Sequence, residues 1–154
     1  MAAQPFLNDE EVLEFEVIEE PWNEYEFNDG SKMRARLIIN RMSRKNKVSP
    51  ISVSSQNIFT ITTSRDKRGP PSPLRPEEIS GQVPVEKTPV KIITSNERWN
   101  AYRVVRDDQT LKVKLLVAEV FRVVNRFDQF GEPAYIVQSG IVVGIPSKAG
   151  RLTP

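Results

Sequence analysis

Two residue types are missing from this chain of 154 residues: cysteine and histidine. The absence of cysteine excludes disulfide bonds and thiolate metal sites. The absence of histidine removes the commonest general base, the commonest metal ligand and the one side chain that ordinarily titrates near neutral pH. Most types of catalytic and metal centre use cysteine or histidine and are therefore excluded. We expect no cofactor and no metal.

Long apolar runs are missing as well. The first residues, MAAQPFLNDEEVLEF, contain neither the basic start nor the apolar centre of a secretory signal. No run approaches the roughly 18 apolar residues that a membrane-spanning helix needs. We expect a soluble, intracellular protein that resides in the cytoplasm and has no membrane partner.

Signatures of enzymes are scarce. There is no glycine-rich phosphate loop, no nucleophile elbow and no cluster with metal-ligand spacing. Asp107 and Asp108 in VRDD (105–108) are more typical of a solvated turn than of a magnesium site. Glu20 and Glu97 lack a neighbour that would tune them for acid–base work. We predict that the protein is not an enzyme and has no evident small-molecule substrate.

Charge is present but unevenly distributed. Residues 1–27 carry nine acidic side chains and no lysine or arginine, whereas residues 28–154 carry 22 basic against 11 acidic side chains. Such asymmetry is compatible with an acidic arm and a separate nucleic-acid surface. It is also compatible with an acidic strand that pairs beside a basic one inside the fold, which is the interpretation we favour.

One unit of sequence is written twice. EEPWNEY (19–25) and NERWNAY (96–102) share the pattern Glu-x-Trp-Asn-x-Tyr, and the match continues in order on both sides. The aligned segments are LEFEVIEEPWNEY with VKIITSNERWNAY, MRARLII with LKVKLLV, and PISVSSQNIFTI with PAYIVQSGIVVGI. This order predicts an internal duplication. Two copies favour a closed pair with pseudo-twofold symmetry over a solenoid array, which needs at least three units.

Both copies alternate with the period of two that is typical of strands with one buried face. In the first copy, Asn28–Gly30 supplies a hairpin loop whose glycine is suited to a positive φ. This loop places Glu26 opposite Lys32 and Glu24 opposite Arg34. Much of the acidic start is then neutralised across one hairpin.

Further hairpins are predicted through RKNK (44–47) and through RFDQFGEP (126–133). The long strand at 111–127 changes phase near Ala118–Glu119, where apolar residues switch faces, and this predicts a β-bulge. RPEEISG (75–81) is the one place that favours a helical turn, with a proline near its start and a glycine at its end.

We predict an all-β fold in which two tandem copies of a β-meander form one pseudo-twofold small barrel or sandwich with a proline-rich connector. The alternative is two independent small barrels. The predicted boundaries are a flexible acidic N-terminus (1–11), β repeat 1 (12–62), a proline-rich linker (63–88), β repeat 2 (89–146) and a flexible C-terminus (147–154).

The doubled motif allows two interpretations. Trp22 and Tyr25 in the first copy, with Trp99 and Tyr102 in the second, could form exposed aromatic platforms that grip a base or a peptide. They could instead anchor the core at the start of each hairpin, since tryptophan and tyrosine combine a large apolar body with a polar tip. We favour the core, because repetition in both copies fits a role in a repeated fold.

Basic residues of the second copy are the candidate binding residues for an anionic partner. Glu24 and Glu26 of the first hairpin become Ala101 and Arg103 in the second, so like charges face one another there and require a counter-charge. A phosphate backbone, an acidic protein surface or the acidic start of the chain could supply it. A solvated strand face without a partner is the interpretation that we favour. The candidates are Arg98, Arg103, Arg106, Lys112, Lys114 and Arg122.

The segment IVQSGIVVGI (136–145) is rich in β-branched residues and has no charged side chain. It is expected either as a buried strand, which we favour, or as an exposed edge that would pair with another chain. The function we predict is non-catalytic binding or assembly through β-edges and charged surface contacts, with a protein partner or self-association. The alternative is a nucleic-acid-binding small barrel that uses the basic hairpin of the second copy.

Overall fold

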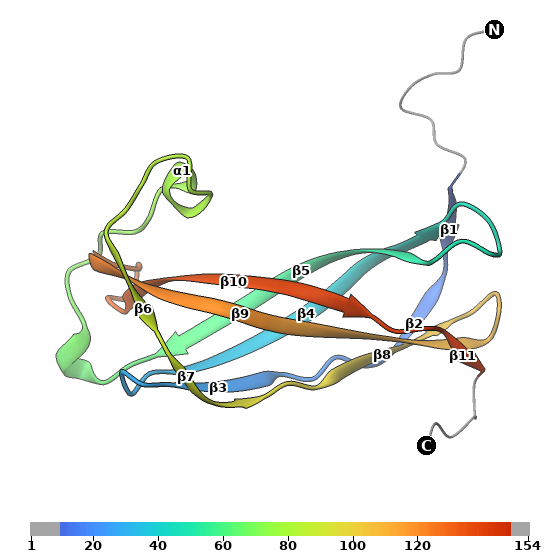
Figure 1. Cartoon of the computed structure of the whole chain (residues 1–154), viewed down its shortest axis with the longest axis horizontal. Coiled ribbons are helices and arrows are strands. Elements are labelled where there is room, and N and C mark those ends of the chain that lie inside the picture. Colours follow the sequence, from blue (N-terminus) through green and yellow to red (C-terminus); the bar gives the residue numbers. More distant parts are fainter. Residues whose placement is uncertain (1–9, 149–154) are drawn as a thin grey trace, which may run out of the picture.

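The computed structural model describes residues 10–148, which fold into two sheets of antiparallel strands arranged as a sandwich (Figure 1). The all-β prediction is confirmed, and the sandwich form of it rather than the barrel form is observed. The elements are β1 (Glu11–Leu13), β2 (Phe15–Glu19), β3 (Asn23–Phe27), β4 (Lys32–Arg44), β5 (Ser52–Thr62), η1 (Arg65–Lys67), α1 (Pro76–Ile79), β6 (Lys87–Val90), β7 (Ile92–Asn96), β8 (Trp99–Val104), β9 (Gln109–Phe127), β10 (Pro133–Val143) and β11 (Ser147–Lys148).

Both sheets are built from both halves of the chain. One sheet has the order β1-β4-β3-β7 with β5 on the other side of β4, and the second has the order β10-β9-β8-β2 with β6 and β11 also paired to β9. Strand β7 of the second half therefore completes the sheet of the first half, and β2 of the first half completes the sheet of the second. Two independent barrels are thereby excluded.

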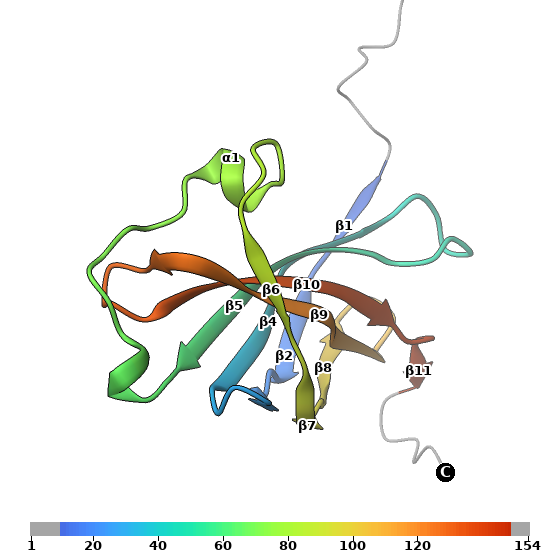
Figure 2. The same ribbon diagram turned by 60° about the vertical axis from the view of Figure 1, so that its left-hand side comes forward.

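The exchange happens where two segments cross from one sheet to the other. The segment β1–β2 leaves β4 and joins β8, and the segment β6–β7 leaves β9 and joins β3. At the crossings, Val105 N–H donates to the carbonyl of Glu14, and Asn28 N–H donates to the carbonyl of Lys91. These segments join the sheets along one side, whereas β5 and β10 lie on the other (Figures 1 and 2).

The first hairpin has the predicted loop and register. Gly30 has φ +86°, and the backbone N–H of Phe27 donates to the carbonyl of Ser31, which leaves Asn28–Gly30 as the loop. Glu24 lies opposite Arg34 and Glu26 lies opposite Lys32. Local alternation and turn chemistry were sufficient to fix this pairing.

The predicted bulge lies at Ala118. Gln138 of β10 pairs with Glu119, and the next residue, Ser139, pairs with Val117, so Ala118 is the extra residue of β9. Strand β4 has a matching irregularity at Asn40, between the pairings of its two neighbours with β5. Both long strands thus bend at corresponding positions of their hairpins.

The core lies between the sheets and contains the tyrosines of the doubled motif but not its tryptophans. Tyr25 is 2% exposed and Tyr102 is fully buried, as predicted. Trp99 is 38% exposed and Trp22 is half-buried, so the prediction that the tryptophans anchor the core is wrong. The physical reason is alternation: Asn23 and Asn100 point inward, and the residue before each must point outward.

The proline-rich connector is fastened to the end of β9. The backbone N–H of Gly69 donates to the carbonyl of Gly131, and that of Ser72 donates to the carbonyl of Phe127. A Cβ on Gly69 would stand 2.5 Å from the Phe127 ring, so only glycine permits this approach. The predicted helical turn is present as α1, beside the β9–β10 end in Figure 1.

The predicted termini fall largely outside the described residues, which exclude 1–9 and 149–154. Within the described part, Glu11 already belongs to β1, and Ser147–Lys148 form β11 against Gln109 and Thr110. In residues 10–148 no helix is long and apolar enough to cross a membrane.

Candidate functional site

The doubled motif forms a buried polar clasp between the two halves of the chain. In the first clasp, the Glu20 carboxylate accepts hydrogen bonds from the Ile39 backbone N–H at 3.1 Å and from the Tyr102 hydroxyl at 2.7 Å. The Asn100 side-chain amide donates to the Leu37 carbonyl at 2.8 Å and to the Tyr102 hydroxyl at 2.8 Å.

The second clasp repeats these bonds with the halves exchanged. Glu97 accepts from the Val117 N–H at 3.0 Å and from the Tyr25 hydroxyl at 2.7 Å. The Asn23 amide donates to the Leu115 carbonyl at 3.2 Å and to the Tyr25 hydroxyl at 3.3 Å. The duplication itself stays a prediction, because matching hydrogen bonds demonstrate matching roles rather than common ancestry.

Each clasp lies where the backbone of a long strand has no neighbouring strand to supply hydrogen-bond partners. Strand β4 pairs with β1 as far as Met42 and with β3 from Ala35, and between them the chain departs to join β8. Backbone groups left there need other partners, because an unsatisfied buried amide or carbonyl is costly. Glu20 and Asn100 supply them, so the motif serves the fold.

The environment of the tyrosines fits this role. Burial and a neighbouring carboxylate raise the pKa of both hydroxyls: Glu97 acts on Tyr25 and Glu20 acts on Tyr102. Desolvation is the largest cause in each case. Both hydroxyls therefore stay protonated and donate to their carboxylates throughout the ordinary pH range.

Three of the six predicted basic candidates are engaged within the chain. Arg103 pairs with Glu16 of β2 at 2.9 Å and with Asp108 at 3.2 Å. Arg106 pairs with Glu11, and Arg122 lies 3.7 Å from Asp29. The prediction that like charges face one another in the second hairpin is wrong, because Arg103 lies opposite Thr110 and Lys112 lies opposite Ala101. Arg103 and Arg106 instead pair with Glu16 and Glu11 of the acidic start, which agrees with the favoured interpretation of the charge asymmetry.

The other three candidates have no ion pair with any residue in 10–148, and one of them, Lys114, lies beside Trp99. Trp99 lies opposite Lys114 in the register, with the Lys114 ammonium 5.6 Å from the ring centre. Lys112 and Arg98 are exposed, and neither has an ion pair with any residue in 10–148. The first copy has a comparable arrangement, with the Arg34 guanidinium 4.4 Å from the Trp22 ring centre.

The candidate functional site is the seam between β5 and β10. Each of these strands pairs with one neighbour only, β4 or β9, so each forms the free edge of its sheet within the described residues. Across the seam the Asn57 amide donates to the Ser139 hydroxyl at 3.3 Å. The expectation that the segment 136–145 is buried is wrong: Ile136 and Val137 are half-buried, and Ile141, Val142 and Val143 are 38–42% exposed.

The two strands of the seam lie in uncharged stretches of the sequence. Residues 50–64 and 133–147 contain no acidic or basic side chain, although 27% of the chain is charged. Natural proteins commonly protect free edges with lysine, proline or inward-pointing charges, because an unprotected edge pairs with other strands. The interiors of β5 and β10 have none of these.

An apolar hollow lies at each end of the seam. One, of about 490 Å³, lies between Phe59 and Ile61 of β5 and the start of β10, where Leu74 and Ile79 of the connector also line it. The other, of about 460 Å³, lies between the β4–β5 loop and the end of β10. The two ends therefore differ, because the connector lines only the first hollow.

Sequence reasoning found β10 as a possible edge but missed β5 as a second edge and the contact between the two edges at Asn57 and Ser139. The uncharged runs 50–64 and 133–147 were the available signal. Within residues 10–148 no group of three or more acidic side chains could hold a metal ion. Comparison of the chain with protein-family models, curated proteins and solved structures found no match.

Proposed function

We propose that this protein is a non-catalytic assembly protein that associates with a second copy of itself through the β10 edge of the seam. The observation that carries the proposal is the uncharged, partly apolar free edge of β10 in a chain that is otherwise densely charged. Edge pairing extends one sheet across two molecules and satisfies backbone groups that are otherwise left to water.

The chemistry of the edge supports a second copy as the partner. Ile141, Val142 and Val143 are β-branched, and β-branched side chains pack well on a paired strand. An edge without charge does not repel its own copy, whereas edges that carry lysine or glutamate do. A twofold pairing of β10 with β10 therefore brings like surfaces together without an electrostatic cost.

Gly140 offers a sharp test, because a Cβ built there meets no atom within 4 Å. Gly140→Lys adds a charge to the edge, and Gly140→Thr is the matched uncharged control. Sedimentation velocity over a range of concentrations should show association for the wild type and for Gly140→Thr, and loss of it for Gly140→Lys. A wild type that stays monomeric at high concentration, or a Gly140→Lys variant that associates equally, overturns the proposal.

A second candidate function, nucleic-acid binding, is favoured by one observation: exposed Lys112 and Arg98 without ion pairs in the described residues, close to Trp99. Such a surface would bind a phosphate backbone with a strong dependence on salt. Binding of a generic oligonucleotide at low salt that is abolished by Lys112→Glu with Arg98→Glu supports it. No detectable binding at low salt removes it.

A further inference from the structure

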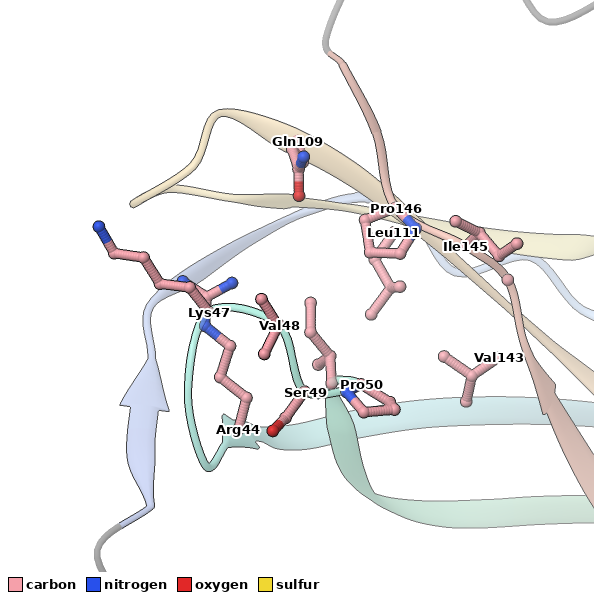
Figure 3. Close-up of a pocket in the computed structure, with 12 residues that line it drawn as sticks. Arg44, Lys47, Val48, Ser49, Pro50, Gln109, Leu111, Val143, Ile145 and Pro146 are labelled. Atoms are coloured by element: carbon pink, nitrogen blue, oxygen red, sulfur yellow. The ribbon is translucent and has the colours of Figure 1, made fainter.

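The hollow beyond the end of β10 has a polar end and an apolar end (Figure 3). Its volume of about 460 Å³ lies within the usual range for sites of small ligands. Arg44 and Lys47 stand at one end in Figure 3, and Val143, Ile145 and Pro146 stand at the other. The remaining lining residues are Val48, Ser49, Pro50, Ile51, Gln109, Leu111 and Gly144.

Arg44 is the unusual residue of this hollow. Its side chain is 5% exposed, and its Nη1 binds Asp107 at 2.5 Å. Its Nε and Nη2 are buried and have no hydrogen-bond acceptor among the described residues. Leaving the donors of a charged group buried and unpaired is unfavourable, so they favour an acceptor from outside the chain.

The two unpaired nitrogens define the shape of that acceptor. Nε and Nη2 form one edge of the planar guanidinium, and their N–H bonds run side by side. A carboxylate accepts from two parallel donors of this kind with its two oxygens. The nearby acids are already engaged, Asp107 with Arg44 and Glu11 with Arg106, whereas Lys47 has no ion pair within residues 10–148.

We infer that this hollow binds a small amphipathic carboxylate, such as a medium-chain fatty acid anion, with the carboxylate on Arg44 and the alkyl chain along Val143, Ile145 and Pro146. The hollow shares Val143 with the β10 edge proposed for self-association, and Arg44 and Lys47 lie outside that edge. The connector covers the equivalent hollow at the other end of the seam with Leu74 and Ile79, and no cation lines that hollow. Of the two hollows at the ends of the seam, the one beside Arg44 therefore combines cationic side chains with an apolar wall.

The test uses octanoate against octanamide, which has the same chain and no charge. Titration calorimetry of the full chain should give octanoate an affinity about tenfold or more higher, because charge-assisted hydrogen bonds are the stronger kind. Because residues 47–51 of the adjoining loop line the same hollow as Arg44, the amide signals of that loop should shift on binding. Equal affinity for the two compounds, or no binding of octanoate, overturns the inference.

Two variants keep the result interpretable. Arg44→Met with Asp107→Asn removes both charges of the buried pair and should abolish the preference for octanoate while leaving octanamide affinity unchanged. If that variant does not fold, Lys47→Gln at an exposed position should lower octanoate affinity and spare octanamide. Arg34→Gln, near the opposite end of β4 from Arg44, is the control and should change neither. Loss of octanoate affinity in the control also counts against the site.

Discussion

At the scale of single residues, the asparagines and tyrosines of the doubled motif contribute more to the core than its tryptophans do. Asn23 and Asn100 are 3% and 2% exposed, and each donates to a backbone carbonyl of the other half of the chain. The two tryptophans of the motif lie at the surface, with the Arg34 guanidinium beside Trp22 and the Lys114 ammonium beside Trp99. Their large apolar area is covered by cationic side chains rather than by the core.

Removal of one clasp asparagine should be costly. Asn100→Ala leaves the Leu37 carbonyl without its donor and opens a small cavity, and we expect a loss of about 2–3 kcal/mol in the free energy of unfolding. Asn57→Ala, at an exposed position, is the control and should change it by less than about 0.5 kcal/mol. Urea unfolding followed by far-UV circular dichroism measures both, and equal effects would contradict the account of the clasp.

The equivalent substitution in the other half supplies a second check. Asn23→Ala removes the donor of the Leu115 carbonyl in the same way and should destabilise by a similar amount. The two clasps share no residue, so the double variant should lose roughly the sum of the two single losses. A double variant that is clearly less destabilised than that sum would show that the clasps do not act independently.

At the scale of elements, the sequence predicted correctly the features that depend on neighbouring residues alone. The Asn28–Gly30 loop, the Glu24–Arg34 register and the bulge at Ala118 follow from turn residues and from the phase of alternation. The position of β10 at a sheet edge does not follow, because a strand's neighbours depend on pairings far along the chain. Its burial was predicted incorrectly for this reason.

The attachment of α1 to β9 should depend on pH. Arg126 lowers the pKa of Glu78 to about 2 through hydrogen bonds of 2.6 and 3.0 Å. A carboxyl whose pKa is lower in the folded state stabilises that state above its unfolded pKa of about 4.5, and the contribution is lost as the pH falls from there toward 2.

Glu78→Gln tests this directly, because it removes the titrating group and keeps the shape of the side chain. Proteolysis of the connector should be faster in Glu78→Gln than in the wild type at pH 7, and the difference should shrink as the pH falls below about 4.5. Glu77→Gln is the neighbouring control and should behave as the wild type. A difference that stays constant down to low pH would refute the role of the Glu78–Arg126 pair.

At the scale of the whole molecule, the exchange of β2 and β7 makes each half incomplete without the other. The sequence predicted two copies and a pseudo-twofold fold, but it did not predict that β2 and β7 each join the sheet of the other half. The alternation of apolar and polar residues in a strand is the same whichever sheet the strand joins. What fixes the exchange is the long-range clasp, in which Glu20 and Asn100 meet only after folding.

Fragments should therefore fold only together. Residues 1–81 and 82–154, cut in the exposed loop after α1, should each lack a cooperative unfolding transition when alone. An equimolar mixture should regain the far-UV spectrum of the intact chain, because the clasps and exchanged strands form between the fragments. A fragment that folds by itself with a cooperative transition would contradict the interdependence of the halves.

We propose that this protein assembles through the free edge of β10. Hydrogen exchange compared at low and high protein concentration measures this most directly, residue by residue. We predict that the β10 amides facing away from β9 exchange more slowly at high concentration, and that Gly140→Lys removes this protection while Gly140→Thr retains it. Association that leaves the β10 amides unchanged and protects another surface instead would contradict the claim.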